Sequence, residues 1–262
     1  MTTTPAWTTA RVVLASTEID AALWAADYAD RCGHGLTVAH TPDRVTQAHD
    51  VTVRLRAGSP RLDVSTRSIP EPIAYGLAAE SHTADLIVLD AEQTVLARTV
   101  TARARCPLVA IPPATNQDDD LPVVVGTDGG HLAEAVVLAG LALATALGTG
   151  VRVVCCTLGT PITGPRSTSV AQATFTVTNS CAEQYPDVPV EVRIARSHPV
   201  TGLIRHARLA SVLVVGSDPT GDDSTSHHLL HRSSTPVALV GPLVPAHRKP
   251  EPLSCSPAAE PS

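Results

Sequence analysis

The feature that most constrains this chain is an α/β unit that occurs twice. Residues 123–156 contain an apolar strand, a Gly/Asp turn, an amphipathic helix, a Gly-x-Gly stop and a second strand. Residues 12–39 run through a less regular version that ends at the same Gly-x-Gly pattern. A strand that enters a helix through a small, glycine-tolerant turn is how open parallel sheets build nucleotide sites. The unequal repeat therefore predicts two domains, of which at most one holds a ligand.

Composition narrows the class of protein further. Aromatic residues make up only 2% of the chain, so its core must consist of Val, Leu, Ile and Ala, as suits buried parallel strands. The net charge is −6 and the arginines are scattered, which argues against nucleic acid as a partner. The longest apolar stretch, 135–147, is too short to span a bilayer. Because no secretory signal is visible, we expect a cytoplasmic protein, and the bias toward Arg, Ala and Val favours a bacterial source.

The six cysteines show no Cys-x-x-Cys spacing, and most lie in or beside apolar strands. Cys155 and Cys156 are adjacent, which disfavours a disulfide between them. We expect buried, reduced and inert thiols, with a redox sensor as the alternative.

The expected boundaries follow the composition. Prolines flank an acidic run between the halves, as in a linker, and the end of the chain is rich in Pro and Ala. The predicted division is an N-terminal domain at 1–113, a linker at 114–122, a C-terminal domain at 123–242 and a disordered tail at 243–262.

In the second half, strands and helical patterns alternate as βαβαβαβαβ, which predicts a parallel sheet covered on both faces. The first half has strand patterns at 12–15, 36–40, 86–89 and 108–111. Between residues 41 and 60, Val51, Val53 and Leu55 alternate like a strand. This alternation favours a β-ribbon or irregular segment over a full helix. We therefore expect the first half to have lost a middle element.

Several motifs of the second half identify a resemblance. They are the turn Gly126-Thr127-Asp128-Gly129, the segment His198-Pro199 with Leu203, Ala207 and Ala210, the strand end Val214-Val215-Gly216-Ser217, and the closing Leu230-His231 and Thr235-Pro236-Val237. In this order they resemble the universal stress proteins, small α/β domains often fused in tandem. In the first half, 83–89 and 106–109 are similar to the same family.

The resemblance implies two tandem open parallel five-stranded sheets, each of order 3-2-1-4-5, with helices on both faces. It also implies that the two domains fold against each other as a pseudo-dimer. In ATP-binding members, the Asp after strand 1 meets ribose and adenine, and a loop Gly-x2-Gly-x9-Gly-Ser/Thr after strand 4 wraps the phosphates. The residues that match these positions, and are candidate nucleotide-binding residues here, are Gly126, Thr127, Asp128, Gly216, Ser217 and Ser224.

The phosphate loop departs from that pattern. Pro219 stands where the second Gly belongs and has neither its freedom nor an N–H, and Asp223 replaces the later Gly. With Asp218 and Asp222, three carboxylates crowd the place of the phosphates. Two unit charges about 6 Å apart repel by about 0.7 kcal/mol in water and by about 3 kcal/mol at an effective dielectric of 20. ATP binding is therefore expected to be weak or lost, unless a metal ion bridges the aspartates and the nucleotide.

Two other features of the second half have alternative readings. Asp128 either contacts a ligand or only caps the following helix, and Asp222, Asp223 and Ser224 also read as a helix N-terminal cap. The array His227, His228 and His231 has metal-like i, i+4 spacing, but no third ligand is fixed, so we predict surface positions and no metal.

The first half has lost more of the pattern. Thr17 occupies the Asp position, Asp90 replaces the strand-4 Gly, and no glycine lies between Asp90 and Pro107. No nucleotide is expected there.

The sequence thus predicts a non-enzymatic regulator of the stress response that acts by binding and association. No Gly-x-Ser-x-Gly elbow exists for a hydrolase, and no catalytic residue is assigned. The expected partners are an unidentified protein and, weakly, an adenine nucleotide, and a homo-oligomer stays open. The alternative is an ATP-binding stress switch with a functional site in the C-terminal domain.

Overall fold

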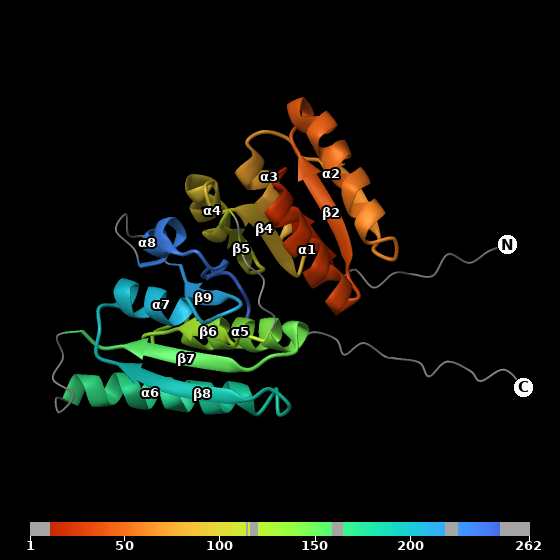
Figure 1. The fold of residues 1–262 in the computed structure, drawn as a ribbon. Coiled ribbons are helices and arrows are strands. Elements are labelled where there is room, and N and C mark those ends of the chain that lie inside the picture. The colour runs from red at the N-terminus through yellow and green to blue at the C-terminus, as the bar shows by residue number, and fades with distance from the viewer. Residues whose placement is uncertain (1–10, 114, 116–119, 159–164, 218–224, 247–262) are drawn as a thin grey trace, which may run out of the picture.

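The computed structural model describes residues 11–113, 115, 120–158, 165–217 and 225–246 (Figure 1). The strands of the first half are β1 (Arg11–Leu14), β2 (Gly35–His40), β3 (Val64–Ser68), β4 (Leu86–Asp90) and β5 (Leu108–Ile111). Its helices are α1 (Ile19–Cys32), the 3-10 turn η1 (Pro42–Arg44), α2 (Val45–Gly58), α3 (Ile73–Glu80) and α4 (Thr94–Thr101).

The second half repeats this alternation of strand and helix. Its strands are β6 (Val123–Gly126), β7 (Val151–Cys156), β8 (Val190–Ala195), β9 (Leu213–Gly216) and β10 (Val237–Val240). Its helices are α5 (Ala133–Leu147), α6 (Pro165–Ala182), α7 (Pro199–Ala207) and α8 (Thr225–Arg232).

Sheet topology confirms the expected α/β class. The full strand order is β3-β2-β1-β4-β5-β10-β9-β6-β7-β8. Read within each half, this is the order 3-2-1-4-5, and all neighbouring pairs inside a half are parallel. Each half therefore has its first and fourth strands side by side, where the direction of winding reverses.

The expectation of two separate sheets needs correction, because the strands form one continuous sheet. Strand β5 pairs antiparallel with β10, with Leu108 opposite Leu239 and Ala110 opposite Val237. Both strands are fully buried, so an open edge at either one would expose unpaired backbone beside apolar side chains. The antiparallel junction also means that the carboxyl ends of the strands in the two halves point to opposite edges of the sheet.

The prediction of a β-ribbon between residues 41 and 60 is wrong. This segment contains helix α2, which buries Ala48, Val51 and Leu55 at helical spacing. Val53, the residue that completed the apparent alternation, is 50% exposed. The third strand, β3, follows directly, so the first half has not lost a middle element.

Helices cover both faces of the sheet, and alternate residues of each strand enter one of two buried clusters. On β1, Val12 belongs to the cluster beneath α1, α2 and α5, whereas Val13 belongs to the cluster beneath α3, α4 and α7. Each cluster runs through both halves. Burying both faces explains why the strands read as continuous apolar runs.

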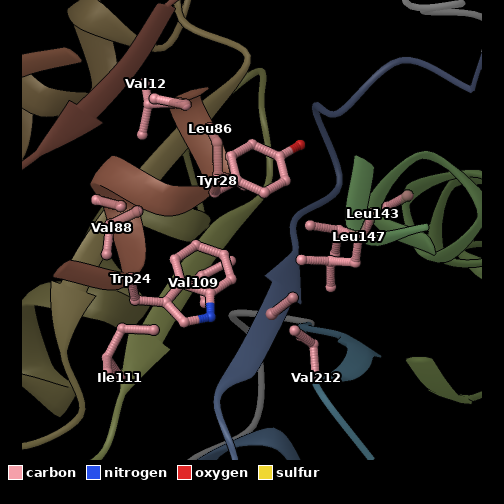
Figure 2. Close-up of a cluster of buried hydrophobic side chains, with 14 of the residues drawn as sticks. Val12, Trp24, Tyr28, Leu86, Val88, Val109, Ile111, Leu143, Leu147 and Val212 are labelled. Atoms are coloured by element: carbon pink, nitrogen blue, oxygen red, sulfur yellow. The ribbon is translucent and has the colours of Figure 1, made fainter. Parts of the chain in front are cut away.

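Aromatic side chains pack where the halves meet. Trp24 and Tyr28 stack with ring centroids 5.4 Å apart and an interplanar angle of 5°. Figure 2 shows them on the α1 side of the junction, with Leu143 and Leu147 of α5 on the other side. Two of the few aromatic residues in the chain thus serve the contact between the halves.

The chain continues past β10 along the same buried cluster. Val244 and Ala246 pack against it as partly buried side chains, and Val244 N donates to Gly241 O at 3.2 Å. Residues 247–262 of the expected tail, and 114 and 116–119 of the expected linker, lie outside the described residues. Within the described residues, no helix combines the length and apolar character that a membrane span requires.

Candidate nucleotide-binding crevices

The second half brings five of the six predicted site residues together. Strands β6 and β9 are parallel neighbours, with Gly126 opposite Val215, so their carboxyl ends meet. Gly126, Thr127 and Asp128 follow one strand, and Gly216 and Ser217 end the other. The sixth residue, Ser224, lies outside the described residues, as do Asp218, Pro219, Asp222 and Asp223.

The two strand-end glycines leave room that neighbouring helices use. A Cβ added to Gly126 would lie 2.8 Å from both terminal methyls of Leu203 on α7. One added to Gly216 would lie 3.1 Å from Leu132 Cδ1, at the start of α5. A larger residue at either position would force these leucine side chains to move, so packing alone favours glycine there, independently of any ligand.

Asp128 is bound to its own turn. Its exposed carboxylate accepts a hydrogen bond from Gly130 N at 2.8 Å, and Thr127 Oγ1 accepts one from Gly129 N at 3.1 Å. Gly129 has a φ of 70°, which favours glycine. The carboxylate thus holds the turn before α5, and its remaining oxygen lone pairs leave acceptor capacity for a ligand.

A thiol lies behind this turn, on the neighbouring strand. Cys155 of β7 is fully buried, and helix α6 comes close to the turn, since a Cβ on Gly129 would lie 3.1 Å from Ala173 Cβ. Burial raises the pKa of Cys155; a hydrogen bond with Thr174 opposes this shift, and the neighbouring Cys156 and Asp128 add to it. The thiol therefore stays protonated and is a poor nucleophile.

Ser217 connects β9 to α8. Its side chain is buried, its N–H donates to Val240 O at 2.9 Å, and its hydroxyl accepts a hydrogen bond from Ser226 Oγ at 3.4 Å. Farther along α8, the rings of His227 and His231 meet edge to face at 4.7 Å. No group of three or more His, Cys, Asp or Glu suited to a metal occurs in the part of the chain that the structure describes.

The corresponding crevice of the first half contains a carboxylate. The pairing of each fourth strand with its fifth places Asp90 at the position that Gly216 holds in the second half. The Asp90 carboxylate accepts hydrogen bonds from the Ser16 hydroxyl and, at 2.6 Å, from Gln93 Nε2. Ser16 Oγ in turn accepts one from Glu18 N at 2.9 Å. These bonds join the ends of β1 and β4.

Sequence reasoning identified Asp90 as a lost glycine but missed its two partners. Ser16 follows the first strand, and Gln93 lies three residues after Asp90. The pairing of β1 with β4 and the turn that precedes α4 bring them to the carboxylate. The contact between Asp90 and Gln93 was predictable from their spacing of three residues. The contact with Ser16 was not, because it depends on the pairing of β1 with β4.

The fold is a doubly wound α/β sheet with a crevice at each of two switch points, and comparison with solved structures gives its class. No family model and no curated protein matches the sequence. Among solved structures, a universal stress protein from Archaeoglobus fulgidus DSM 4304 is 12% identical with a TM-score of 0.60, over 90% of this chain and 99% of that one.

Two further structures resemble the whole chain. A putative universal stress protein from Pseudomonas aeruginosa UCBPP-PA14 is 15% identical with a TM-score of 0.58, over 90% of this chain and 94% of that one. The cytoplasmic domain of a prokaryotic cation chloride cotransporter is 15% identical with a TM-score of 0.56, over 89% and 95%. The chain therefore has the universal stress protein fold in its tandem form, as its motifs indicated.

Proposed function

We propose that this protein is a non-enzymatic, cytoplasmic regulator of the stress response that acts by binding and association. Its second half binds adenine nucleotide at most weakly, and its first half binds none. The observation that carries the proposal is the difference between the two fourth-strand ends: Asp90 accepts two side-chain hydrogen bonds in the first half, whereas the uncharged Gly216 ends the strand in the second half.

In the first half, a nucleotide phosphate would meet a charge of its own sign. Asp90 is held between Ser16 and Gln93, so it cannot turn away without losing both hydrogen bonds. At an effective dielectric of 20, two unit charges about 4 Å apart repel by about 4 kcal/mol. This cost supports the absence of a phosphate ligand in the first half.

In the second half, weak binding is supported by what remains at the strand ends. Gly126 and Gly216 place no side chain between β6 and β9, and the exposed Asp128 carboxylate has acceptor capacity for ribose hydroxyls. The sequence beyond Ser217 has Pro219 and Asp223 at the two later glycine positions of the phosphate loop, with Asp218 and Asp222 beside them. We therefore expect the nucleoside to contribute most of the affinity and the terminal phosphates little.

A binding role is supported by the chemistry of the described side chains in this crevice. The nearest thiol, Cys155, is buried and protonated, and Ser217 is buried with its hydroxyl bonded to Ser226. Neither has a histidine or carboxylate hydrogen-bonded to it among the described residues, as an activated nucleophile requires. One structural neighbour is a domain of a transport protein, so the fold is compatible with acting through association.

A ligand titration of the full chain tests the proposal. Calorimetry with ATP, AMP and cyclic AMP, with and without Mg²⁺, should give at most one weak site, with AMP binding about as well as ATP. Asp128→Ala should remove that binding, whereas the matched control Asp120→Ala, in the acidic linker, should not. A clear preference for Mg-ATP over AMP would instead favour an ATP-binding stress switch, and steady phosphate release would contradict the non-enzymatic role.

A further inference from the structure

The continuous sheet ends in two open edges, β3 at one end and β8 at the other. On β8, the carbonyls of Pro189 and Ala195 accept hydrogen bonds from Val151 N and Thr157 N, each at 2.8 Å. Backbone groups alternate in direction along a strand, so odd-numbered residues bond to β7. The N–H and C=O groups of the even-numbered residues therefore point out of the sheet. These are Val190, Val192 and Ile194.

The two edges differ in how they are protected. On β3, the outward carbonyl of Val64 accepts hydrogen bonds from Arg56 Nε at 3.2 Å and Nη2 at 2.6 Å, so a side chain of α2 covers the start of this edge. No such bond reaches the outward groups of β8 from the residues that the structure describes. An unprotected outer strand is a template for pairing with another strand.

One face of β8 carries two opposite charges, Glu191 and Arg193, which can pair with the same two residues of a second antiparallel copy. Glu191 accepts a hydrogen bond from Arg152 Nε at 2.8 Å and forms an ion pair with Arg193. The bond from Arg152 lowers the pKa of Glu191, so its carboxylate stays ionised at neutral pH. On the opposite face of the strand, Ile194 is 37% exposed.

Hydrogen-bond direction and charge together select one partner register. If two copies of β8 pair antiparallel, even-numbered residues must face even-numbered residues for the outward groups to bond. A two-fold axis at residue 191 would oppose Glu191 to Glu191, and one at residue 193 would oppose Arg193 to Arg193. An axis at Val192 instead places Glu191 opposite Arg193 twice and brings Val190 against the exposed Ile194.

We infer that β8 is a self-association surface, which pairs antiparallel with β8 of a second copy about a two-fold axis at Val192. The sheet already contains one antiparallel junction of this kind, between β5 and β10. The β8 pairing extends the sheet through a symmetric dimer, with β3 left at each end. The inference goes beyond the proposed function and is independent of nucleotide binding.

Analytical ultracentrifugation of the full chain tests this surface. The wild type should sediment as a concentration-dependent dimer. Val192→Pro removes an outward N–H together with a partly buried valine side chain, and should weaken the dimer at least about tenfold, because the central hydrogen-bonded pair is lost. The matched control Thr66→Pro removes an outward N–H on β3 and should leave the dimer intact. A monomeric wild type, or a dimer that Val192→Pro leaves unchanged, would overturn the inference.

Charge complementation distinguishes specific pairing from a folding defect. Glu191→Arg places arginine opposite arginine, and Arg193→Glu places glutamate opposite glutamate, so each variant alone should be monomeric. When the two variants are mixed, positions 191 and 193 of one variant face opposite charges at positions 193 and 191 of the other. The mixture should therefore form a heterodimer. If the mixture stays monomeric while the wild type dimerises, or if either variant dimerises like the wild type, β8 is not the interface in this register.

Discussion

The two crevices of this sheet have the same strand order but different residues at the end of the fourth strand. In the second half, glycines end β6 and β9, and the exposed Asp128 carboxylate accepts a hydrogen bond from its own turn. In the first half, Asp90 stands at the strand-4 end and joins Ser16 to Gln93. The end of the fourth strand thus carries an uncharged glycine in one half and a hydrogen-bonded carboxylate in the other.

This difference shows that both halves can keep the same strand order although only one keeps the glycine at the end of its fourth strand. Both buried clusters pass through both halves, so the closed half remains part of the common core. The crevices open at opposite edges of the sheet because β5 and β10 are antiparallel. We therefore expect substitutions in the two crevices to act independently on binding while sharing one unfolding transition.

The largest expected effect comes from a substitution in the core that the two halves share. Trp24 is 5% exposed and stacks on Tyr28 beside α5, so Trp24→Ala should lower the free energy of unfolding by about 3–5 kcal/mol. Denaturant unfolding of the full chain, followed by circular dichroism, should show a single transition shifted as a whole. Leu23→Ala, on the exposed neighbour, serves as the control and should change little. Two separate transitions, only one of them shifted, would show that the halves unfold independently.

A smaller effect compares the two aspartates directly. Asp90→Ala removes two side-chain hydrogen bonds to a half-buried carboxylate and should cost about 1–3 kcal/mol. Asp128→Ala removes one exposed turn bond and should cost less than about 1 kcal/mol. Equal losses in the same denaturant assay would contradict the larger structural contribution assigned to Asp90.

The smallest effect concerns pH. Burial lowers the pKa of His206, and the nearby Arg205 lowers it further; burial also lowers the pKa of His34, where Asp85 opposes the shift. The unfolded chain therefore takes up protons near pH 6.5, before the folded chain does, and stability should fall as the pH drops below about 6.5. His206→Gln should flatten this loss more than His34→Gln. Melting temperatures between pH 7.5 and 5.5 measure it, and an unchanged slope would count against burial as the cause.

Much of the fold was readable because parallel strands buried on both faces appear as apolar runs. The paired Gly-x-Gly stops indicated the repeat, and the resemblance that the second-half motifs carry implied the strand order in each half. The misreading of α2 has a local cause: Val51, Val53 and Leu55 alternate, but only the first and last are buried. The continuous sheet was not predictable from either half, because its β5–β10 junction depends on how two finished halves meet.

The candidate site was predictable where it depends on strand ends. Gly126, Asp128 and Gly216 come together because the first and fourth strands are neighbours in this topology. The bond from Ser16 to Asp90 joins residues 74 apart in the chain, so no local pattern revealed it. The nucleotide role of Gly126, Thr127, Asp128, Gly216, Ser217 and Ser224 stays a prediction.

The central proposal, that an adenine nucleotide binds weakly and only to the second half, is tested most directly by binding stoichiometry. Equilibrium dialysis of AMP and ATP against the full chain should approach at most one equivalent, at similar weak affinity for both ligands. Asp90→Ala should leave that stoichiometry unchanged, and Asp128→Ala should reduce it to none. Two equivalents bound, or a single tight equivalent of ATP that survives Asp128→Ala, would contradict the account.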